Sequence, residues 1–374
     1  MPELTPEFLA KVLDATSPQG DPSDALVLAD AFLERGEPRR AAAALDRAFG
    51  LAPNDPDIAR QRAAVLESLA LVEHGLRFRF VPGGPFLMGS AAGDPDERPV
   101  HVARTGDFWI ADVPLTWAAY CDLLGWKPPP DGSPKVEVEQ DEEIYEANQM
   151  RLQYCETETV QAGDWHAHAP AQEWTSNGQP VTSTDLFGTP PRTHPDRPYQ
   201  YDVKPLIAVS FLQAERLRQR LATPALELRL PTEDEWEKAA RGGLIGAKYS
   251  WGHAPPDPAR CDFGHFGEFV IHDPRRYPPN GYGLHAMCGT VMEWTSDVYD
   301  ALTYRNGRPD PTGWVPPNRT GQAPRNRATL PPRVVRGGSW SDCAEACTVS
   351  FRCSQDERTE TPSIGLRLVR CERR

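Results

Sequence analysis

The chain has 374 residues, of which 25% are charged, 9% are aromatic and 39 are proline. This length suits one large domain of roughly 250 to 300 residues together with a small one. The aromatic content excludes a chain that is disordered throughout, and the prolines predict many loops. The formal net charge of −13 disfavours nucleic acid and anionic membranes as partners, because binding to phosphates depends on lysines and arginines.

The first residues, Met1 to Glu7, contain no basic stretch followed by an apolar run, and no window approaches the about 18 apolar residues that cross a bilayer. We therefore expect no membrane contact and a cytoplasmic location. Eight cysteines in such a chain are expected to be reduced thiols rather than a disulfide framework. Four of them fall in the last 32 residues, which draws attention to a thiol or metal site: Cys343, Cys347, Cys353 and Cys371.

Apolar residues recur at spacings of three and four between positions 24 and 70, which predicts short helices. Residues 25 to 56 resemble one tetratricopeptide repeat, and residues 57 to 72 resemble the helix that would follow it. A single repeat cannot bury both of its faces. The segment is therefore either a helical cap packed on the main domain or a docking surface for a partner.

A change from helical to β-like patterning marks a domain boundary. Short β-like runs occupy 77–81 and 108–111, with glycine and proline turns between them. We accordingly expect a helical segment at 1–75 and a main domain at 76–374. Within the main domain, residues from about 127 to 200 contain an acidic run and many polar residues and prolines, which predicts an irregular insertion on the surface.

Two later segments carry signals for the start of a helix. Ser210 precedes an amphipathic run and is expected to be its N-cap. Thr232, followed by Glu235, predicts a capping box, and Gly242 is expected to end that second helix.

The main domain carries five characteristic blocks: Phe80 to Gly89, Arg229 to Gly243, Tyr249 to Gly252, Pro279 to Asp297, and Arg336 to Trp340 with Gly365 to Arg367. In this order they resemble the formylglycine-generating-enzyme (sulfatase-modifying-factor) family, over roughly residues 79 to 371. The resemblance implies an α+β, C-type-lectin-like domain with limited regular structure and many loops.

The resemblance also implies a candidate copper site. Catalytic members of the family convert a cysteine of a client protein to formylglycine with molecular oxygen and copper(I), which is a soft ion that prefers sulfur. Their two copper cysteines follow the serine of the Gly-Gly-Ser motif by three and by eight residues. Here Cys347 follows Ser339 by eight residues, whereas Asp342 stands at the first position and Cys343 is displaced by one. If the chain is an oxidase, Cys343 and Cys347 are its copper ligands and catalytic thiols, and Ser339 lines the oxygen pocket.

A calcium site of the family is altered in this sequence. His285 and Thr290 stand where catalytic members usually carry asparagine, which leaves Glu293 and backbone carbonyls as oxygen ligands. Because calcium takes six to eight oxygens, we expect at most a weak site at Glu293.

Two functions remain open, and the sequence does not decide whether the chain is an enzyme. The leading interpretation is a non-catalytic module that binds a protein or peptide, and the displaced cysteine favours it. It resembles in this respect the variable proteins of diversity-generating retroelements, which display a loop on the same fold. The alternative is the copper- and oxygen-dependent oxidase. The expected ligand-binding loop comprises Trp340, Ser341, Asp342, Glu345, Thr348 and Ser350.

Overall fold

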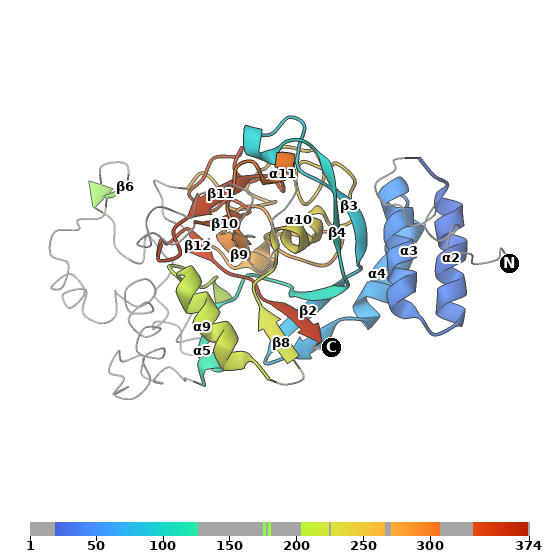
Figure 1. Ribbon diagram of the computed structural model, residues 1–374, viewed down its shortest axis with the longest axis horizontal. Coiled ribbons are helices and arrows are strands. Elements are labelled where there is room, and N and C mark those ends of the chain that lie inside the picture. The colour runs from blue at the N-terminus through green and yellow to red at the C-terminus, as the bar shows by residue number, and fades with distance from the viewer. Residues whose placement is uncertain are drawn as a thin grey trace.

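A computed structural model of the chain describes residues 19–125, 175–176, 179–180, 203–223, 226–265, 271–306 and 332–372 (Figure 1). The insertion expected at about 127–200 lies outside these residues, apart from two short antiparallel strands, β6 (Thr175–Ser176) and β7 (Gln179–Pro180). None of the helices in the described ranges has the length and apolar character that a membrane span requires.

From residue 19 onward, the described N-terminal part contains three helices, which Figure 1 shows side by side against one flank of the body: α2 (Pro22–Glu34), α3 (Pro38–Leu51) and α4 (Pro56–Ser68). Each begins with a proline, whose missing N–H costs nothing in the first turn. Asp21 and Asp55 cap α2 and α4 by accepting hydrogen bonds from backbone N–H groups. Helices therefore occupy the segment whose periodicity predicts them, and their relation to a tetratricopeptide repeat stays a prediction.

The larger sheet has five antiparallel strands in the order β1 (Leu71–Glu73), β2 (Leu76–Val81), β5 (Phe108–Ala111), β13 (Val369–Glu372) and β8 (Leu226–Arg229). The two β-like runs that the sequence predicts are thus neighbouring strands, with Phe80 opposite Trp109. Strand β13 lies between β5 and β8, so this C-terminal segment is an interior strand of the sheet.

The second sheet has four strands in the order β11 (Arg352–Gln355), β10 (Arg333–Arg336), β9 (Met292–Val298) and β12 (Ile364–Gly365), and only β12 runs parallel to its neighbour. A two-stranded ladder joins β3 (Gly84–Met88) to β4 (His101–Thr105). The described ranges also contain the helices α5 (Trp117–Leu124), α9 (Phe211–Leu221), α10 (Glu233–Arg241) and α11 (Thr303–Asn306), and the 3-10 turns Pro95–Glu97 and Pro274–Arg276.

The predicted helix starts are confirmed. Ser210 caps α9 and Thr232 caps α10, each in a complete capping box. Gly242 ends α10 in the left-handed conformation, with φ of 61°. Helix α10 packs against β3, β4, β9 and β10 and thereby joins the ladder to the second sheet. This mixture of helices and separate sheets is an α+β architecture, as expected.

Arg62 of α4 joins the N-terminal helices to the main domain. Its side chain, 2% exposed, pairs with Asp46 of α3 at 2.6 Å and donates hydrogen bonds to the backbone carbonyls of Gly242 and Gly281. Tyr282 lies against the same guanidinium and donates its hydroxyl to Asp46 at 2.8 Å. A single cluster of buried apolar residues also runs from these helices into the domain. The helices are therefore packed on the domain as a cap.

Candidate functional site

The loop that follows β10, residues 337–351, carries most of the residues that the sequence analysis selects. It begins with Gly337 and Gly338, whose φ angles are 102° and 67°. A Cβ on Gly337 would lie 3.0 Å from the ring of Trp236, and one on Gly338 would lie 2.7 Å from the carbonyl oxygen of Ala346. Only glycine combines these angles with such close packing. The loop is therefore folded back on itself against α10.

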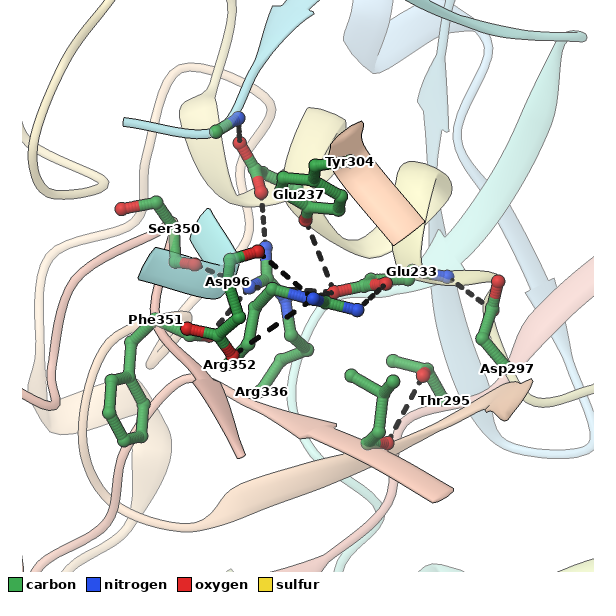
Figure 2. Close-up of polar contacts among 12 residues, drawn as sticks. Asp96, Glu233, Glu237, Thr295, Asp297, Tyr304, Arg336, Ser350, Phe351 and Arg352 are labelled. Atoms are coloured by element: carbon green, nitrogen blue, oxygen red, sulfur yellow. Dashed lines mark hydrogen bonds and ion pairs between the residues drawn. The ribbon is translucent and has the colours of Figure 1, made fainter. Parts of the chain in front are cut away.

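Buried ion pairs hold the end of this loop in place (Figure 2). Arg336, fully buried, pairs with Glu237 of α10 and donates hydrogen bonds to the carbonyls of Val349, Ser350 and Phe351. Removing one member of such a pair leaves an uncompensated charge in the interior. The position of the 349–351 backbone thus depends on an arginine that precedes it by more than a dozen residues.

A second arginine extends the network to two further segments. Arg352 pairs with Glu233 at 2.6 Å and donates hydrogen bonds to the carbonyls of Asp96 and Asp300. Glu233 also accepts a hydrogen bond from the hydroxyl of Tyr304. The segment around Asp96 and the end of the 337–351 loop are therefore fixed relative to each other.

The structure divides the expected ligand-binding loop between the core and a cavity. Trp340 is 2% exposed and donates its indole N–H to the carbonyl of Pro362, so it is a core residue. Ser339 is fully buried, and its hydroxyl contacts the carboxylate of Asp342 at 2.6 Å and the hydroxyl of Ser341 at 3.0 Å. The last three residues of the expected ligand-binding loop, Glu345, Thr348 and Ser350, line one cavity together.

The two thiols of the expected copper site have different surroundings. Cys347 is fully buried, its S–H donates to the carbonyl of Cys343 at 3.6 Å, and burial raises its pKa. Cys343 is exposed, and its thiol hydrogen-bonds the carboxylate of Glu345. Copper(I) needs two ionised thiolates directed at one point. The burial of Cys347 and the exposure of Cys343 place the two thiols in different surroundings, which disfavours a shared copper(I) ion.

Glu293 does not fit a calcium ion. Both of its carboxylate oxygens accept hydrogen bonds from Arg367, the closest at 2.8 Å, and one accepts a further bond of 2.7 Å from the indole of Trp236. A cation at this place would have to displace a guanidinium. More widely, the described parts of the chain hold no group of three or more His, Cys, Asp or Glu side chains suited to a metal ion.

The cavity beside the loop has a volume of about 560 Å³. Its lining includes Glu345, Thr348 and Ser350 together with the run of small residues from Gly89 to Gly93 and Glu97. Arg241 and Lys248 also line the cavity. Glu97 is buried, at 4% exposure. Sequence reasoning missed Glu97, Arg241 and Lys248, because an acidic residue in the run Gly93-Asp-Pro-Asp-Glu97 gives no signal of its depth.

A second polar cluster, also missed, lies on the other side of the loop. The carboxylate of Asp262 is fully buried between two imidazoles, at 3.2 Å from His265 and 3.0 Å from His272. Backbone hydrogen bonds join this segment to the loop, from Gly264 N–H to the carbonyl of Asp342 and from His265 N–H to that of Trp340. The segment that carries Asp262 and His265 is therefore hydrogen-bonded to the loop.

Comparisons with known proteins agree with this fold. The formylglycine-generating enzyme of Thermomonospora curvata is 29% identical over 73% of this chain and 84% of its own length. The inactive C-alpha-formylglycine-generating enzyme 2 of Bos taurus is 35% identical over 37% of this chain and 42% of its own. The structure of PvdO from Pseudomonas aeruginosa superposes with a TM-score of 0.50 at 16% identity, covering 80% of this chain and 97% of that one.

These likenesses confirm the C-type-lectin-like α+β fold expected from the sequence. The model of the family described as the sulfatase-modifying factor enzyme 1-like domain matches residues 73–372, which is most of the main domain. The chain therefore belongs to the sulfatase-modifying factor enzyme 1-like (formylglycine-generating-enzyme) family.

Proposed function

We propose that this chain is a non-catalytic member of its family that binds a protein or peptide partner in the cavity between the 89–97 segment and Glu345, Thr348 and Ser350. The observation that carries the proposal is the state of the thiols. Cys347 is buried with a raised pKa while Cys343 faces solvent. One buried and one exposed thiol are a poor match for the pair of thiolates that holds copper(I).

The cavity supports the binding half of the proposal. Its volume of about 560 Å³ falls within the range of ligand sites. Its walls are rigid, because Arg336 and Arg352 fix the 349–351 backbone and the segment around Asp96 through buried ion pairs. Preformed walls reduce the ordering cost of binding. One protein similar to this chain is named an inactive formylglycine-generating enzyme.

A narrower form of the proposal makes the loop a display surface, as in the variable proteins of diversity-generating retroelements. In that form the exposed positions, such as Cys343 and Glu345, would vary, whereas the buried Trp340 would be retained. The expected cytoplasmic location stays a prediction.

The competing oxidase is tested by a competitive copper(I) titration of the intact chain under anaerobic conditions, beside Cys347→Ser. We expect no tight site that depends on Cys347. Tight one-to-one binding that disappears in Cys347→Ser would replace the proposal with the oxidase.

Binding is tested by panning a random dodecapeptide display library on the intact chain. The pocket-filling variant is Ala92→Trp, because Ala92 is exposed and lines the cavity. Its control is Ala301→Trp, at an exposed position that is not part of the cavity lining. We expect peptides that bind the wild type and Ala301→Trp but not Ala92→Trp. If no peptide is enriched, or if Ala92→Trp binds as well as the control, the proposed site is wrong.

A further inference from the structure

Glu97 is a buried carboxylate whose hydrogen-bonding capacity is unused. The residue is 4% exposed and lines the cavity, and the hydrogen bonds found among the described residues include none to its carboxylate. Buried polar groups in proteins are nearly always hydrogen-bonded, because leaving a charged oxygen without a donor is costly. The carboxylate is therefore suited to a donor that arrives from the cavity.

A neighbouring arginine compensates the charge of Glu97 without meeting its need for donors. The charge of the Arg336 guanidinium interacts with that of Glu97. The terminal N–H groups of Arg336, however, donate to Glu237 and to backbone carbonyls of the 349–351 segment. A charge-assisted hydrogen bond to a cation needs an anion with free lone pairs, and the carboxylate of Glu97 has them.

The cationic groups of the cavity are occupied elsewhere. Arg241 pairs with Glu237 at 2.6 Å and donates to the carbonyls of Gly89 and Ala247. Lys248 lies 5.3 Å from the ring centre of Tyr249, and its charge interacts with that of Glu345. Asp94, exposed at the rim, adds a further negative charge. The cavity lining thus has three carboxylates, those of Asp94, Glu97 and Glu345, beside the two cationic side chains.

The residues of the 91–93 run, which line the cavity together with Glu97, are small. A Cβ on Gly93 would lie 2.1 Å from Oε2 of Glu97 and would push the carboxylate aside. Ala91 and Ala92, which precede it, are exposed and also line the cavity. Larger side chains in this run would cover the carboxylate.

We propose that Glu97 is the anchor of the binding site and that it receives a basic side chain, a lysine ammonium or an arginine guanidinium, from the partner polypeptide. This inference rests on the proposed function and adds the chemistry of the ligand. A guanidinium presents paired donors to a carboxylate, so an arginine is expected to bind more tightly than a lysine.

The test uses the same dodecapeptide library, panned in parallel on the wild type and on Glu97→Gln, which keeps the shape of the side chain and removes its charge. We expect peptides enriched on the wild type to share a lysine or arginine. In calorimetry, replacing that residue by norleucine or citrulline should weaken binding about tenfold or more, the usual effect of losing a hydrogen bond to a charged group. On Glu97→Gln the preference should vanish.

Two further variants guard against a folding artefact. Gly93→Ala retains the charge of Glu97 but displaces the carboxylate, so it should also weaken the basic peptide. Glu34→Gln makes the same change at an exposed carboxylate of α2 that is not part of the cavity lining, and it should leave the preference intact. Circular dichroism and thermal unfolding establish that each variant is folded.

The outcomes separate this inference from the proposed function. Peptides that are blocked by Ala92→Trp but lack a basic residue, or that bind Glu97→Gln equally well, would overturn the role of Glu97 and leave the site standing. A library that yields no binder would overturn both.

Discussion

The hydroxyl of Ser339 donates a hydrogen bond of 2.6 Å to the carboxylate of Asp342, three residues further along the loop that follows β10. Asp342 stands at the position where the resemblance to catalytic relatives places the first copper cysteine. The serine of the Gly-Gly-Ser motif is thus engaged by an oxygen acceptor within its own loop. Together with the separate surroundings of Cys343 and Cys347, this contact favours a structural role for the loop over a copper site.

The thiol surroundings predict a large difference in reactivity. Burial raises the pKa of Cys347, so its thiol stays protonated to a higher pH than an ordinary cysteine, whereas Cys343 is exposed. With iodoacetamide at about pH 8, we expect the peptide that carries Cys343 to be alkylated first and Cys347 only after denaturation. Peptide mapping by mass spectrometry distinguishes the two. Rapid labelling of Cys347 in the native chain would show that its thiol is accessible after all.

Arg62 predicts how strongly the helical cap is attached. Arg62→Ala removes the donor of the carbonyls of Gly242 and Gly281 and the cationic partner of Asp46, which keeps the hydroxyl of Tyr282. This change should lower the free energy of unfolding by about 3 kcal/mol or more. The matched control is Arg60→Ala on the same helix, whose pair with Asp57 is exposed on both sides and should contribute less than about 1 kcal/mol. Urea unfolding measures both. Equal effects would mean that the buried network does not hold the cap.

Local signals in the sequence predicted the helix starts at Ser210 and Thr232 and the strands at 77–81 and 108–111, because caps and alternation depend on neighbouring residues. Glu97 could not be found in this way. Its depth depends on segments that are distant in the chain and meet only in the folded domain, as when Arg352 binds the carbonyl of Asp96. For the same reason the sequence did not separate Trp340, a core residue, from Glu345, which lines the cavity.

Lys238 predicts a specific dependence of stability on pH. Burial lowers its pKa from 10.5 to about 8, although the charges of Asp46 and Asp107 oppose the shift. Because the folded pKa lies below the unfolded one, the stability that the neutral amine contributes is present above pH 10.5 and is lost as the pH falls through about 8. The charged amine therefore destabilises the fold at about pH 7, by about 3 kcal/mol.

Replacing this lysine by methionine removes the titrating group. The free energy of unfolding of Lys238→Met, minus that of the wild type, should fall by up to about 3 kcal/mol as the pH rises from about 7 to 10.5. The loss of hydrogen bonds to Thr105 and to the carbonyl of Gly84 shifts the whole curve but not its slope. Lys248→Met, at an exposed lysine, is the control. A difference that does not change with pH would mean that Lys238 is solvated.

Gly338 allows the packing of the loop to be separated from its backbone conformation. Gly338 and Gly36 have nearly the same left-handed φ, 67° and 71°, but a Cβ on Gly338 would meet the carbonyl oxygen of Ala346 at 2.7 Å, whereas one on Gly36 would meet nothing within 4 Å. Substitution by alanine should therefore cost about 1 to 2 kcal/mol of conformational strain at both positions, and a further 1 kcal/mol or more, about the usual effect of overpacking, only at Gly338. Unfolding in urea, with the two variants side by side, gives this difference directly, since the effect of alanine on the unfolded chain is common to both. If Gly338→Ala is no less stable than Gly36→Ala, the loop has room to move away from Ala346, and the rigid wall that we assign to the binding cavity loses its support.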